Sequence, residues 1–303
     1  MIELHDTNAS QIAAEFVRAR RGSGSPAMGM VMTLIIVVPE DHALVAFDSA
    51  RLASQEHPAR VLGVILGDGR GHGQISAQVG IGDGRSGETA LIRLKGEVVR
   101  HASSVVLPLL LPDSPVAVWW PVDPPQEPAA DPLGSLAQRR ITDSAAVTKG
   151  RTVALRHQCS AYAPGNTDLA WTRLTPWRAM LAAAVDQRPF RVTRAHVVGE
   201  RVSPSADLMV AWLTDRLGVE VERSTSDGPG ITEVTLEGKH ETISLARADG
   251  KTAVLSVTGA PDRHVALPRR PVAELLAEEL RHLDEDEPYA EAAATLLTLA
   301  GQD

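Results

Sequence analysis

A chain of 303 residues, 44% of them hydrophobic, is long enough to form two globular domains. Its formal charge of −8 at pH 7 argues against a general nucleic-acid-binding protein, because phosphate contacts require clustered Lys and Arg. Its one cysteine, Cys159, excludes an intrachain disulfide and a thiolate metal site. The N-terminus lacks the basic segment of a secretory signal, and the longest apolar run, residues 28–38, is shorter than a membrane span. The sequence therefore predicts a cytoplasmic protein without a membrane segment.

The first 120 residues show an α/β pattern. A helix predicted over residues 9–21 is followed by an apolar, β-branched run at 30–38, which is typical of a strand buried on both faces. Together with a helix predicted at 43–54, which Asp41 is expected to cap, and a strand at 61–66, this run predicts a parallel β-α-β unit. Alternating patterns at 74–81 and 88–94 predict antiparallel strands, residues 97–107 a helix, and residues 116–120 a short strand.

The remainder of the chain begins with a proline-rich loop at 121–132, and residues 133–161 give no clear pattern. Asp168 or Thr167 is expected to cap a short helix, and Thr175-Pro176 starts a helix that extends to about residue 185. A strand is predicted at 190–198, and a helix follows Ser203-Pro204 and ends at Gly218. Further predicted elements are strands at 219–223, 232–236, 241–246 and 252–257 and helices at 271–283 and 289–300. Residues 284–287 are interpreted as a solvated acidic connector.

The predicted fold class is α/β, with two mixed-sheet α/β domains of similar element order joined by a helical and loop central segment. The predicted domains are residues 1–120, the N-terminal α/β domain, and residues 189–303, the C-terminal α/β domain. Residues 121–188 are predicted to form a proline-rich loop and a basic helical segment rich in Trp and Arg. No residue-level repeat relates the two halves, so coincidence is an equal alternative for their similar order.

The sequence offers few candidates for a reaction centre. Gly82, Gly84 and Gly87 have the spacing of a dinucleotide-binding loop, but an alternating strand follows them, so we interpret them as part of a hairpin turn. The ten histidines form no HxxxH or HxH pair, and neither a Gly-x-Ser-x-Gly nor a Walker A pattern occurs. His157 lies two residues from Cys159, but a buried structural cysteine is favoured over a nucleophile pair. We predict no metal, cofactor or catalytic residue.

The segment from Pro164 to Arg178 is the most unusual in composition and holds two of the five tryptophans. Between Arg139 and Arg178 the chain has seven Arg or Lys residues and only two Asp residues, so this part is basic. The tryptophans could be core residues between domains, but unpaired buried arginines would be costly. Exposed Arg and Trp, in contrast, bind carboxylates, phosphates and partner proteins. We therefore predict an exposed binding patch for an acidic partner surface or a phosphorylated ligand, formed by Trp119, Trp120, Arg139, Arg140, Asp143, Thr167, Asp168, Trp171, Arg173, Trp177 and Arg178.

The chain contains the motifs Trp119-Trp120-Pro121, Asp131-Pro132-Leu133-Gly134, Arg139-Arg140-Ile141-Thr142-Asp143, the segment from Gly165 to Arg178, and His57-Pro58-Ala59-Arg60-Val61. These motifs closely resemble the signature of the OpcA family, the glucose-6-phosphate dehydrogenase assembly proteins. The resemblance spans nearly the whole chain, and its central motif is long and unusual in composition. Residues 208–218 are also similar to a family motif.

The resemblance implies a non-catalytic protein with an N-terminal and a C-terminal α/β domain. It would bind glucose-6-phosphate dehydrogenase, which opens the oxidative pentose phosphate pathway and makes NADPH, and would support its assembly or activate it allosterically. Family members in photosynthetic bacteria are linked to thiol-based redox control of the dehydrogenase. This chain departs from that pattern, because Cys159 alone cannot close an internal disulfide.

Two other functions compete with this one. The first is a sensor or enzyme that binds a sugar phosphate or nucleotide through the Arg cluster. The second is nucleic-acid binding through the basic segment, which the acidic remainder of the chain disfavours.

Overall fold

The computed structural model describes residues 2–23, 29–81 and 87–301 and divides the chain into two compact units. Unit 1 comprises Met1–Asp143, Ala163–Thr167 and Val272–Glu285, and unit 2 comprises Ser144–Tyr162, Asp168–Pro271 and Asp286–Asp303. The chain thus passes between the units five times. Some parts of residues 121–188 belong to unit 1 and the other parts to unit 2. The predicted boundaries at residues 120 and 188 do not coincide with this division.

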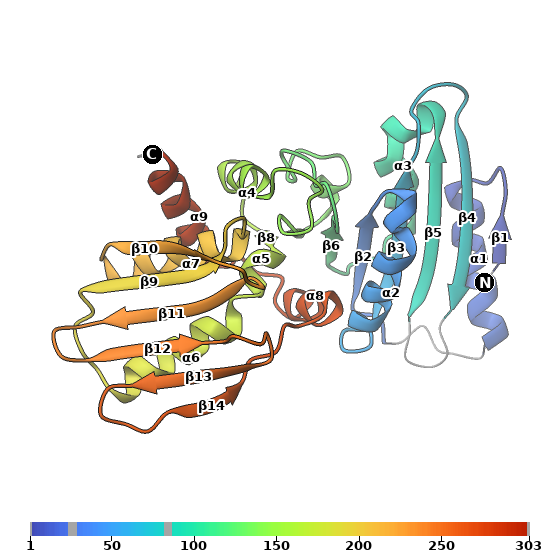
Figure 1. Cartoon of the computed structure of the whole chain (residues 1–303). Coiled ribbons are helices and arrows are strands. Elements are labelled where there is room, and N and C mark those ends of the chain that lie inside the picture. Colours follow the sequence, from blue (N-terminus) through green and yellow to red (C-terminus); the bar gives the residue numbers. More distant parts are fainter. Residues whose placement is uncertain (1, 24–28, 82–86, 302–303) are drawn as a thin grey trace. The chain divides into compact units, whose positions relative to one another are not determined.

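Unit 1 is built on a mixed sheet, which has eight strands in the described part of the chain, in the order β1-β4-β5-β3-β2-β6-β7-β8 (Figure 1). Strands β5, β3, β2, β6 and β7 are parallel, and β4 and then β1 add antiparallel at one edge. The strands are β1 (Ile2–Leu4), β2 (Met32–Val37), β3 (Ala59–Leu66), β4 (Gln74–Ile81), β5 (Glu88–Lys95), β6 (Val116–Trp119), β7 (Arg139–Thr142) and β8 (Asn166–Asp168).

The helices of unit 1 pack against this sheet and against one another. Helix α1 contacts β4, and α2 contacts β2, β3 and α8. The core is aliphatic, as the scarcity of aromatic residues requires, and Ile12 and Phe16 of α1 belong to it. The helices are α1 (Ala9–Ser23), α2 (Ala43–Ala53), α3 (Ala102–Val106) and α8 (Val272–Arg281), with 3-10 turns η1 (Glu40–His42), η2 (Gly96–His101), η3 (Leu107–Leu109) and η4 (Gly134–Leu136).

The predicted parallel β-α-β unit is confirmed by β2, α2 and β3, since Met32 pairs with Ala59 and Val37 with Val64. The hairpin interpretation of the glycine motif agrees with the antiparallel pairing of β4 and β5, although Gly82 and Gly84 lie outside the described residues. Gly87 serves a close backbone approach, because a Cβ at this position would lie 2.1 Å from the backbone oxygen of Ala59.

Some predictions for unit 1 are wrong. Asp41 lies in η1 and does not cap α2, whose N-cap is His42 without a side-chain hydrogen bond. The helix predicted at 97–107 is instead η2 followed by the short α3 and η3. Strands β7 and β8 arise where the sequence shows no alternation, because β6 supplies hydrogen bonds to β7 and thereby compensates for weak local preference.

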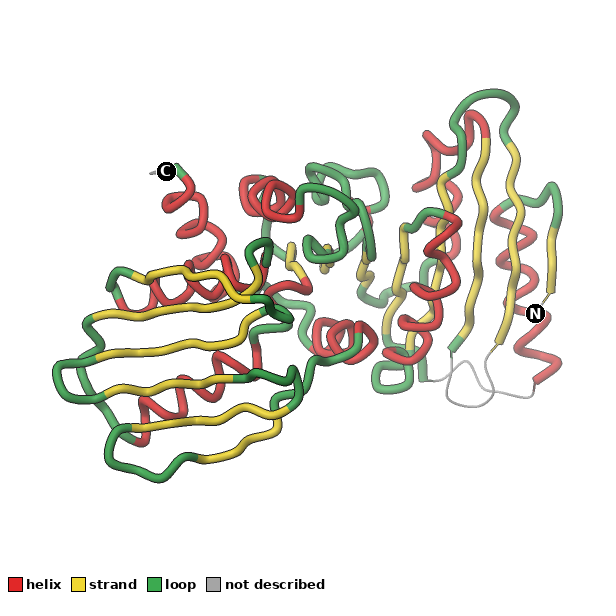
Figure 2. Tube along the Cα trace, in the orientation of Figure 1, coloured by secondary structure: helices red, strands yellow, loops and turns green. Residues whose placement is uncertain are grey.

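Unit 2 contains a second sheet, which has six strands in the described residues, in the order β10-β9-β11-β12-β13-β14. Only β9 and β10 are parallel neighbours among these strands. Alternate residues of β9 are buried, and helices α6 and α7 cover one face of the sheet (Figures 1 and 2), as is typical of antiparallel sheets. The strands are β9 (Arg194–Glu200), β10 (Val221–Ser226), β11 (Ile231–Glu237), β12 (Thr242–Ala246), β13 (Thr252–Val257) and β14 (Arg263–Ala266).

The helices of unit 2 begin and end largely where the sequence predicts. Ser203 caps α7 by accepting a hydrogen bond from the Ala206 backbone at 3.3 Å, and Gly218 ends the helix at φ 62°. Strand β14 and helix α4 were not predicted. The helices are α4 (Arg151–Ser160), α5 (Leu169–Thr172), α6 (Thr175–Gln187), α7 (Pro204–Leu217) and α9 (Glu287–Ala300).

The α/β class with two mixed sheets is confirmed. Each sheet contains a parallel β-α-β unit, β2-α2-β3 in unit 1 and β9-α7-β10 in unit 2, and the two element orders share this part. Their strand orders differ, because β5 adds parallel to β3 whereas β11 adds antiparallel to β9. Among the described residues, no helix combines the length and apolar character needed to cross a membrane.

Candidate functional site

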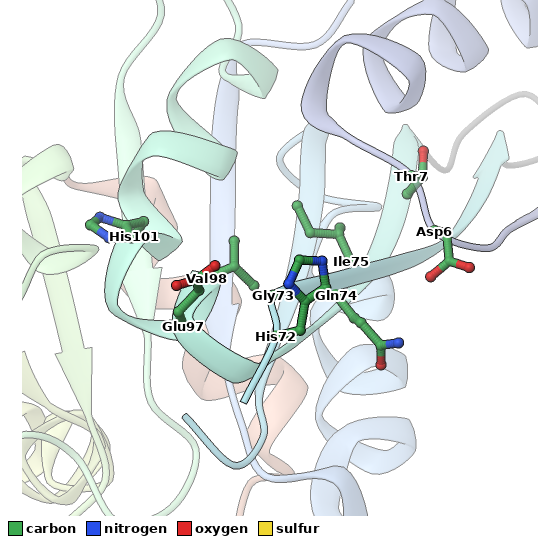
Figure 3. A pocket seen from close by; sticks show the side chains of 9 residues that line it. All are labelled: Asp6, Thr7, His72, Gly73, Gln74, Ile75, Glu97, Val98 and His101. Atoms are coloured by element: carbon green, nitrogen blue, oxygen red, sulfur yellow. The ribbon is translucent and has the colours of Figure 1, made fainter. Parts of the chain in front are cut away.

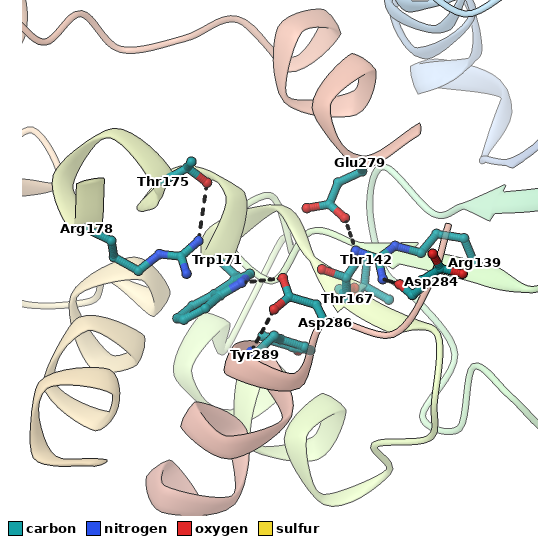
Figure 4. A network of polar contacts seen from close by, with 10 residues as sticks. All are labelled: Arg139, Thr142, Thr167, Trp171, Thr175, Arg178, Glu279, Asp284, Asp286 and Tyr289. Carbon is teal, nitrogen blue, oxygen red and sulfur yellow. Dashed lines mark hydrogen bonds and ion pairs between the residues drawn. The ribbon is translucent and has the colours of Figure 1, made fainter. Parts of the chain in front are cut away.

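The predicted patch residues are largely buried, and the structure distributes them between the two units. In unit 1, Arg139 of β7 is 3% exposed and forms an ion pair with Glu279 of α8 (Figure 4). Its Nη1 also donates a hydrogen bond to the backbone oxygen of Asp284 at 2.9 Å. The Arg139 guanidinium is therefore paired inside the protein and is not presented to a ligand.

The Arg140 side chain is surrounded by two backbone oxygens and one side-chain oxygen of the same unit. It donates hydrogen bonds to Asn166 Oδ1 and to the backbone oxygen of Ala137, both at 2.6 Å, and to the backbone oxygen of Pro164. The Pro164-Gly165 turn closes over this side chain. Gly165 has φ +87°, and a Cβ there would lie 2.0 Å from the backbone oxygen of Gln138. The turn motif and the arginine thus form one structural feature.

The threonines and aspartates of the signature form hydrogen bonds that connect chain segments within each unit. Thr142 Oγ1 donates to the backbone oxygen of Thr167 at 3.1 Å within unit 1. In unit 2, Asp168 caps α5 by accepting a hydrogen bond from the Ala170 backbone at 2.8 Å, which confirms one of the two predicted caps. The same carboxylate accepts hydrogen bonds from Ser144 N and Oγ, the latter at 2.6 Å. Asp143, 1% exposed, is also buried and bonded.

Trp171 lies in the core of unit 2 and is 1% exposed. Its indole Nε1 donates to Asp286 Oδ2 at 2.8 Å, and the Arg178 guanidinium stacks 3.6 Å from the ring centroid (Figure 4). The Tyr289 ring centroid lies 5.8 Å from that of Trp171, and Asp286 also caps α9 through the Tyr289 backbone at 3.0 Å. The segment at 284–287 connects α8 and α9, and Asp284, Glu285 and Glu287 are exposed, as predicted for a solvated connector. Asp286 is the exception, because it is partly buried and holds both Trp171 and the start of α9.

The remaining tryptophans of the predicted patch are core residues as well. Trp177 is 2% exposed, with the Arg247 guanidinium 5.0 Å from its ring centroid. Trp119 and Trp120 are buried in unit 1, where Trp120 belongs to the same core as Leu133. The nearby Gly134 leaves room for this packing, because a Cβ there would lie 3.0 Å from Trp120 Cη2 and 1.8 Å from the Pro128 backbone oxygen.

The prediction of an exposed patch is therefore wrong in its geometry. Arg173 and Arg178 are the two predicted residues that are partly exposed. The physical reason is that a carboxylate and carbonyl oxygens in unit 1 and an aromatic face in unit 2 interact with the guanidinium groups, so burial does not leave their charges without a partner. The nine buried residues are Trp119, Trp120, Arg139, Arg140, Asp143, Thr167, Asp168, Trp171 and Trp177.

Arg60, in the motif His57-Pro58-Ala59-Arg60-Val61, follows the same pattern. Its Nε donates to Glu88 Oε2 at 2.8 Å and its Nη1 to the Leu109 backbone oxygen at 2.6 Å. Its guanidinium carbon lies 4.8 Å from the centroid of the Phe16 ring. The contacts of this arginine therefore also lie inside unit 1.

The point where the strand order of unit 1 reverses has no dinucleotide-binding loop. Strand β2 has β3 on one side and β6 on the other, and a dinucleotide bound at such a point requires a glycine-rich turn after the strand. Here the turn is Val38-Pro39-Glu40-Asp41. Arg93 hydrogen-bonds Glu40 at 2.8 Å and lowers the pKa of its carboxyl group. An ionised carboxylate at this turn disfavours a pyrophosphate.

Unit 1 also has an open cavity of about 760 Å³ (Figure 3). Figure 3 shows His101 at one end of the labelled residues and Asp6 and Thr7 at the other, with His72 and Glu97 between them. Within the described part of the chain, no group of three or more His, Cys, Asp or Glu side chains could hold a metal ion. The cavity is a polar surface groove, and none of the residues that line it was predicted to be a site residue.

The Cys159 thiol is unsuited to nucleophilic chemistry. It is 3% exposed, and burial, with a smaller contribution from the Asp168 charge, raises its pKa from 9.0 to about 12. At pH 9 the folded chain should therefore hold about a thousandth of this thiol as thiolate, against half in the unfolded chain.

We expect a coloured disulfide reagent at pH 9 to label Cys159 rapidly in urea-unfolded protein and very slowly in folded protein. His157→Gln should leave the slow rate unchanged, because the imidazole does not activate the thiol. Equal rates for folded and unfolded protein would contradict the structural role.

Comparison with known proteins identifies two matching family models. One model describes the N-terminal domain of the glucose-6-phosphate dehydrogenase subunit, and it matches residues 50–159. The other model describes the C-terminal domain of the same glucose-6-phosphate dehydrogenase subunit, and it matches residues 164–293. Both models carry the OpcA name. No curated protein matches the chain.

The solved structures that are similar to this chain include two oxidoreductases of low sequence identity. A 3-ketoreductase from Actinomadura kijaniata is 11% identical at a TM-score of 0.47, over 89% of this chain and 96% of that chain. An oxidoreductase from Sinorhizobium meliloti is 11% identical at a TM-score of 0.43, over 88% and 87%. Scores and identities this low assign no activity to the chain.

Proposed function

Because the chain belongs to the OpcA family, we propose that it is a non-catalytic protein that binds glucose-6-phosphate dehydrogenase in the cytoplasm and supports the assembly or activity of that enzyme. The observation that carries this proposal is the pair of family models, which together span residues 50–293 with a short gap and name a subunit of the dehydrogenase.

The use of the signature residues supports binding rather than catalysis. Arg139, Arg140 and Trp171 make internal contacts that hold chain segments in place, so they stabilise the fold and do not present reactive groups. The acidic turn after β2 and the protonated Cys159 thiol also agree with a non-catalytic role, because the turn disfavours a pyrophosphate and the thiol is a poor nucleophile.

The alternative function, recognition of a sugar phosphate or nucleotide by the predicted Arg cluster, loses its basis. Arg139 donates to Glu279 and to a backbone oxygen, and Arg140 donates to three oxygens of unit 1. A phosphate would have to displace these buried acceptors, which would leave Glu279 without its cation.

The mechanism we propose is a shift of population. A protein that binds the active oligomer of the dehydrogenase about tenfold more tightly than the inactive form shifts their equilibrium by about 1.4 kcal/mol. The test is to mix purified dehydrogenase with this chain and measure co-elution, oligomeric state and initial rate. We expect a stable complex and a larger active fraction. Separate elution with unchanged oligomer and rate would refute the proposal.

Within the signature, we assign direct partner contact to Arg173. Arg173 and Arg178 are the two residues of the predicted patch that are partly exposed, and both also interact with other residues of the chain. We choose Arg173 because Arg178 stacks on the core residue Trp171, so a substitution of Arg178 would disturb the core. Arg173→Gln should weaken dehydrogenase binding about tenfold, or about 1.4 kcal/mol, at a temperature where a melting curve shows that the variant is folded. Titration calorimetry with the purified enzyme measures this effect.

The matched control is Arg191→Gln, which removes the same charge from an exposed position of unit 2 outside the signature. If both substitutions weaken binding equally, the effect is one of net charge, and the assignment to Arg173 is refuted.

A further inference from the structure

Unit 2 contains a small cavity where α4, α7 and α9 meet strand β10. Its volume is about 150 Å³. The charged residues at the cavity come from three elements, with Arg156 on α4, Asp207 on α7 and Arg223 on β10. Apolar side chains form the rest of the wall, and they include Val210, Leu296 and Leu299. The cavity thus combines a hydrocarbon wall with a few convergent charged groups, the composition typical of small-molecule sites.

The Arg223 guanidinium is fixed in position by three hydrogen bonds to backbone oxygens. Its Nη1 donates to the backbone oxygens of Gly199, at 3.2 Å, and Ser224, and its Nη2 donates to that of Glu200. Its Nε is buried without a hydrogen-bond partner among the described residues and lies 3.9 Å from Asp207 Oδ1. These contacts hold the guanidinium at the wall of the cavity, where its positive charge favours an anion.

Among the described residues that line the cavity, Asp207 is the one acidic residue. Burial raises the pKa of its carboxyl group, while the charges of Arg223 and Arg156 and a hydrogen bond from Thr152 oppose the rise. Helix α9 contributes Leu296, Leu299 and Ala300, which carry no charge. A carboxyl group that retains its proton more readily can donate a hydrogen bond to an anion instead of repelling it.

The charge balance and the size of the cavity define its ligand. Arginine remains protonated in proteins, so two guanidinium groups face one carboxyl group and favour an anion. A cavity of about 150 Å³ holds a group the size of benzene. We propose that this cavity of unit 2 binds the oxyanion of a small molecule, a carboxylate or phosphate, with Arg156 and Arg223 as cationic contacts and Asp207 as a hydrogen-bonding contact.

The test is titration calorimetry of the full chain with inorganic phosphate and, separately, with butyrate, at constant ionic strength set by sodium chloride. Phosphate represents a phosphorylated ligand, and butyrate a carboxylate with a short hydrocarbon tail. We expect saturable binding of at least one of them, and the tighter of the two identifies the class. Arg156→Gln should lower that affinity about tenfold, because it removes a charge-assisted contact.

Arg151→Gln is the matched control, since Arg151 is also exposed on α4 but does not line the cavity. Asp207→Asn should keep or raise the affinity, because the amide donates a hydrogen bond without carrying a negative charge. Melting curves confirm that each variant is folded.

The proposal is overturned if neither anion binds saturably to the wild-type chain, or if Arg151→Gln and Arg156→Gln weaken binding equally. A loss with Asp207→Asn as large as that with Arg156→Gln overturns the assigned role of Asp207. The experiment requires no dehydrogenase, so its outcome is independent of the proposed function.

Discussion

Arg139→Met should lower the free energy of unfolding of the chain by about 3–5 kcal/mol. Arg139 and Glu279 have side chains that are 3% and 6% exposed, so the substitution leaves a carboxylate buried without its ion-pair partner. The backbone oxygen of Asp284 also loses its donor. Denaturant-induced unfolding, followed by circular dichroism, measures the change.

A double-mutant cycle separates the ion pair from general packing. Glu279→Met alone should also destabilise the chain strongly, whereas the double variant should regain most of the loss, because two apolar side chains replace two charges. Additive single effects would contradict a coupled pair. Arg281 and Glu56 form an exposed control pair on α8 and just after α2, at 56% and 55% exposure, and Arg281→Met should cost no more than about 1 kcal/mol.

The sequence predicted the hydrophobic framework of both units because that information is local. The continuous apolar runs became β2 and β3, and the alternating patterns became paired strands. Helix ends were predictable where a residue type has a specific backbone role, as at Ser203 and Gly218. Local reasoning failed at β7, whose residues show no alternation and depend on β6 for hydrogen bonds.

The candidate site was wrongly predicted to be exposed because charges were counted along the sequence, without the partners that the fold brings close. Arg139 pairs with Glu279, 140 residues away, and Trp171 bonds Asp286, 115 residues away. A short stretch of sequence around one partner does not include the other. The central segment therefore appeared to carry unpaired positive charge. One usable signal existed. Asp286 precedes Glu287-Pro288, a pattern that indicates a helix cap, and capping residues are commonly fixed by hydrogen bonds.

The crossings of the chain between the two units provide a physical explanation for the signature motifs. The chain passes from unit 1 to unit 2 after Asp143, Thr167 and Glu285. Thr142 bonds the Thr167 backbone on the unit 1 side, and Asp168 bonds Ser144 on the unit 2 side. The motifs therefore hold the chain segments in place, within each unit, at the residues where the chain enters or leaves it. Their unusual composition reflects buried polar contacts.

Trp171→Ala should lower the free energy of unfolding by about 3–5 kcal/mol, the cost of truncating a buried aromatic side chain. The change removes the ring that packs against Tyr289 and Arg178 and leaves Asp286 without the indole donor. Trp171→Phe keeps an aromatic ring and removes the hydrogen bond, so a smaller loss of about 1–2 kcal/mol is expected. Thermal and denaturant unfolding of both variants measure these differences.

The same two variants distinguish a core residue from a docking residue. Below its unfolding transition, Trp171→Phe should bind the dehydrogenase with nearly the affinity of the wild-type chain, because the indole is 1% exposed and cannot reach a partner without local unfolding. A docking tryptophan would behave in the opposite way, since its loss would weaken binding by about 2 kcal/mol and leave the unfolding midpoint in place. Binding measured at several temperatures below the midpoint decides between them, because a stability effect grows as the midpoint is approached and a contact effect does not.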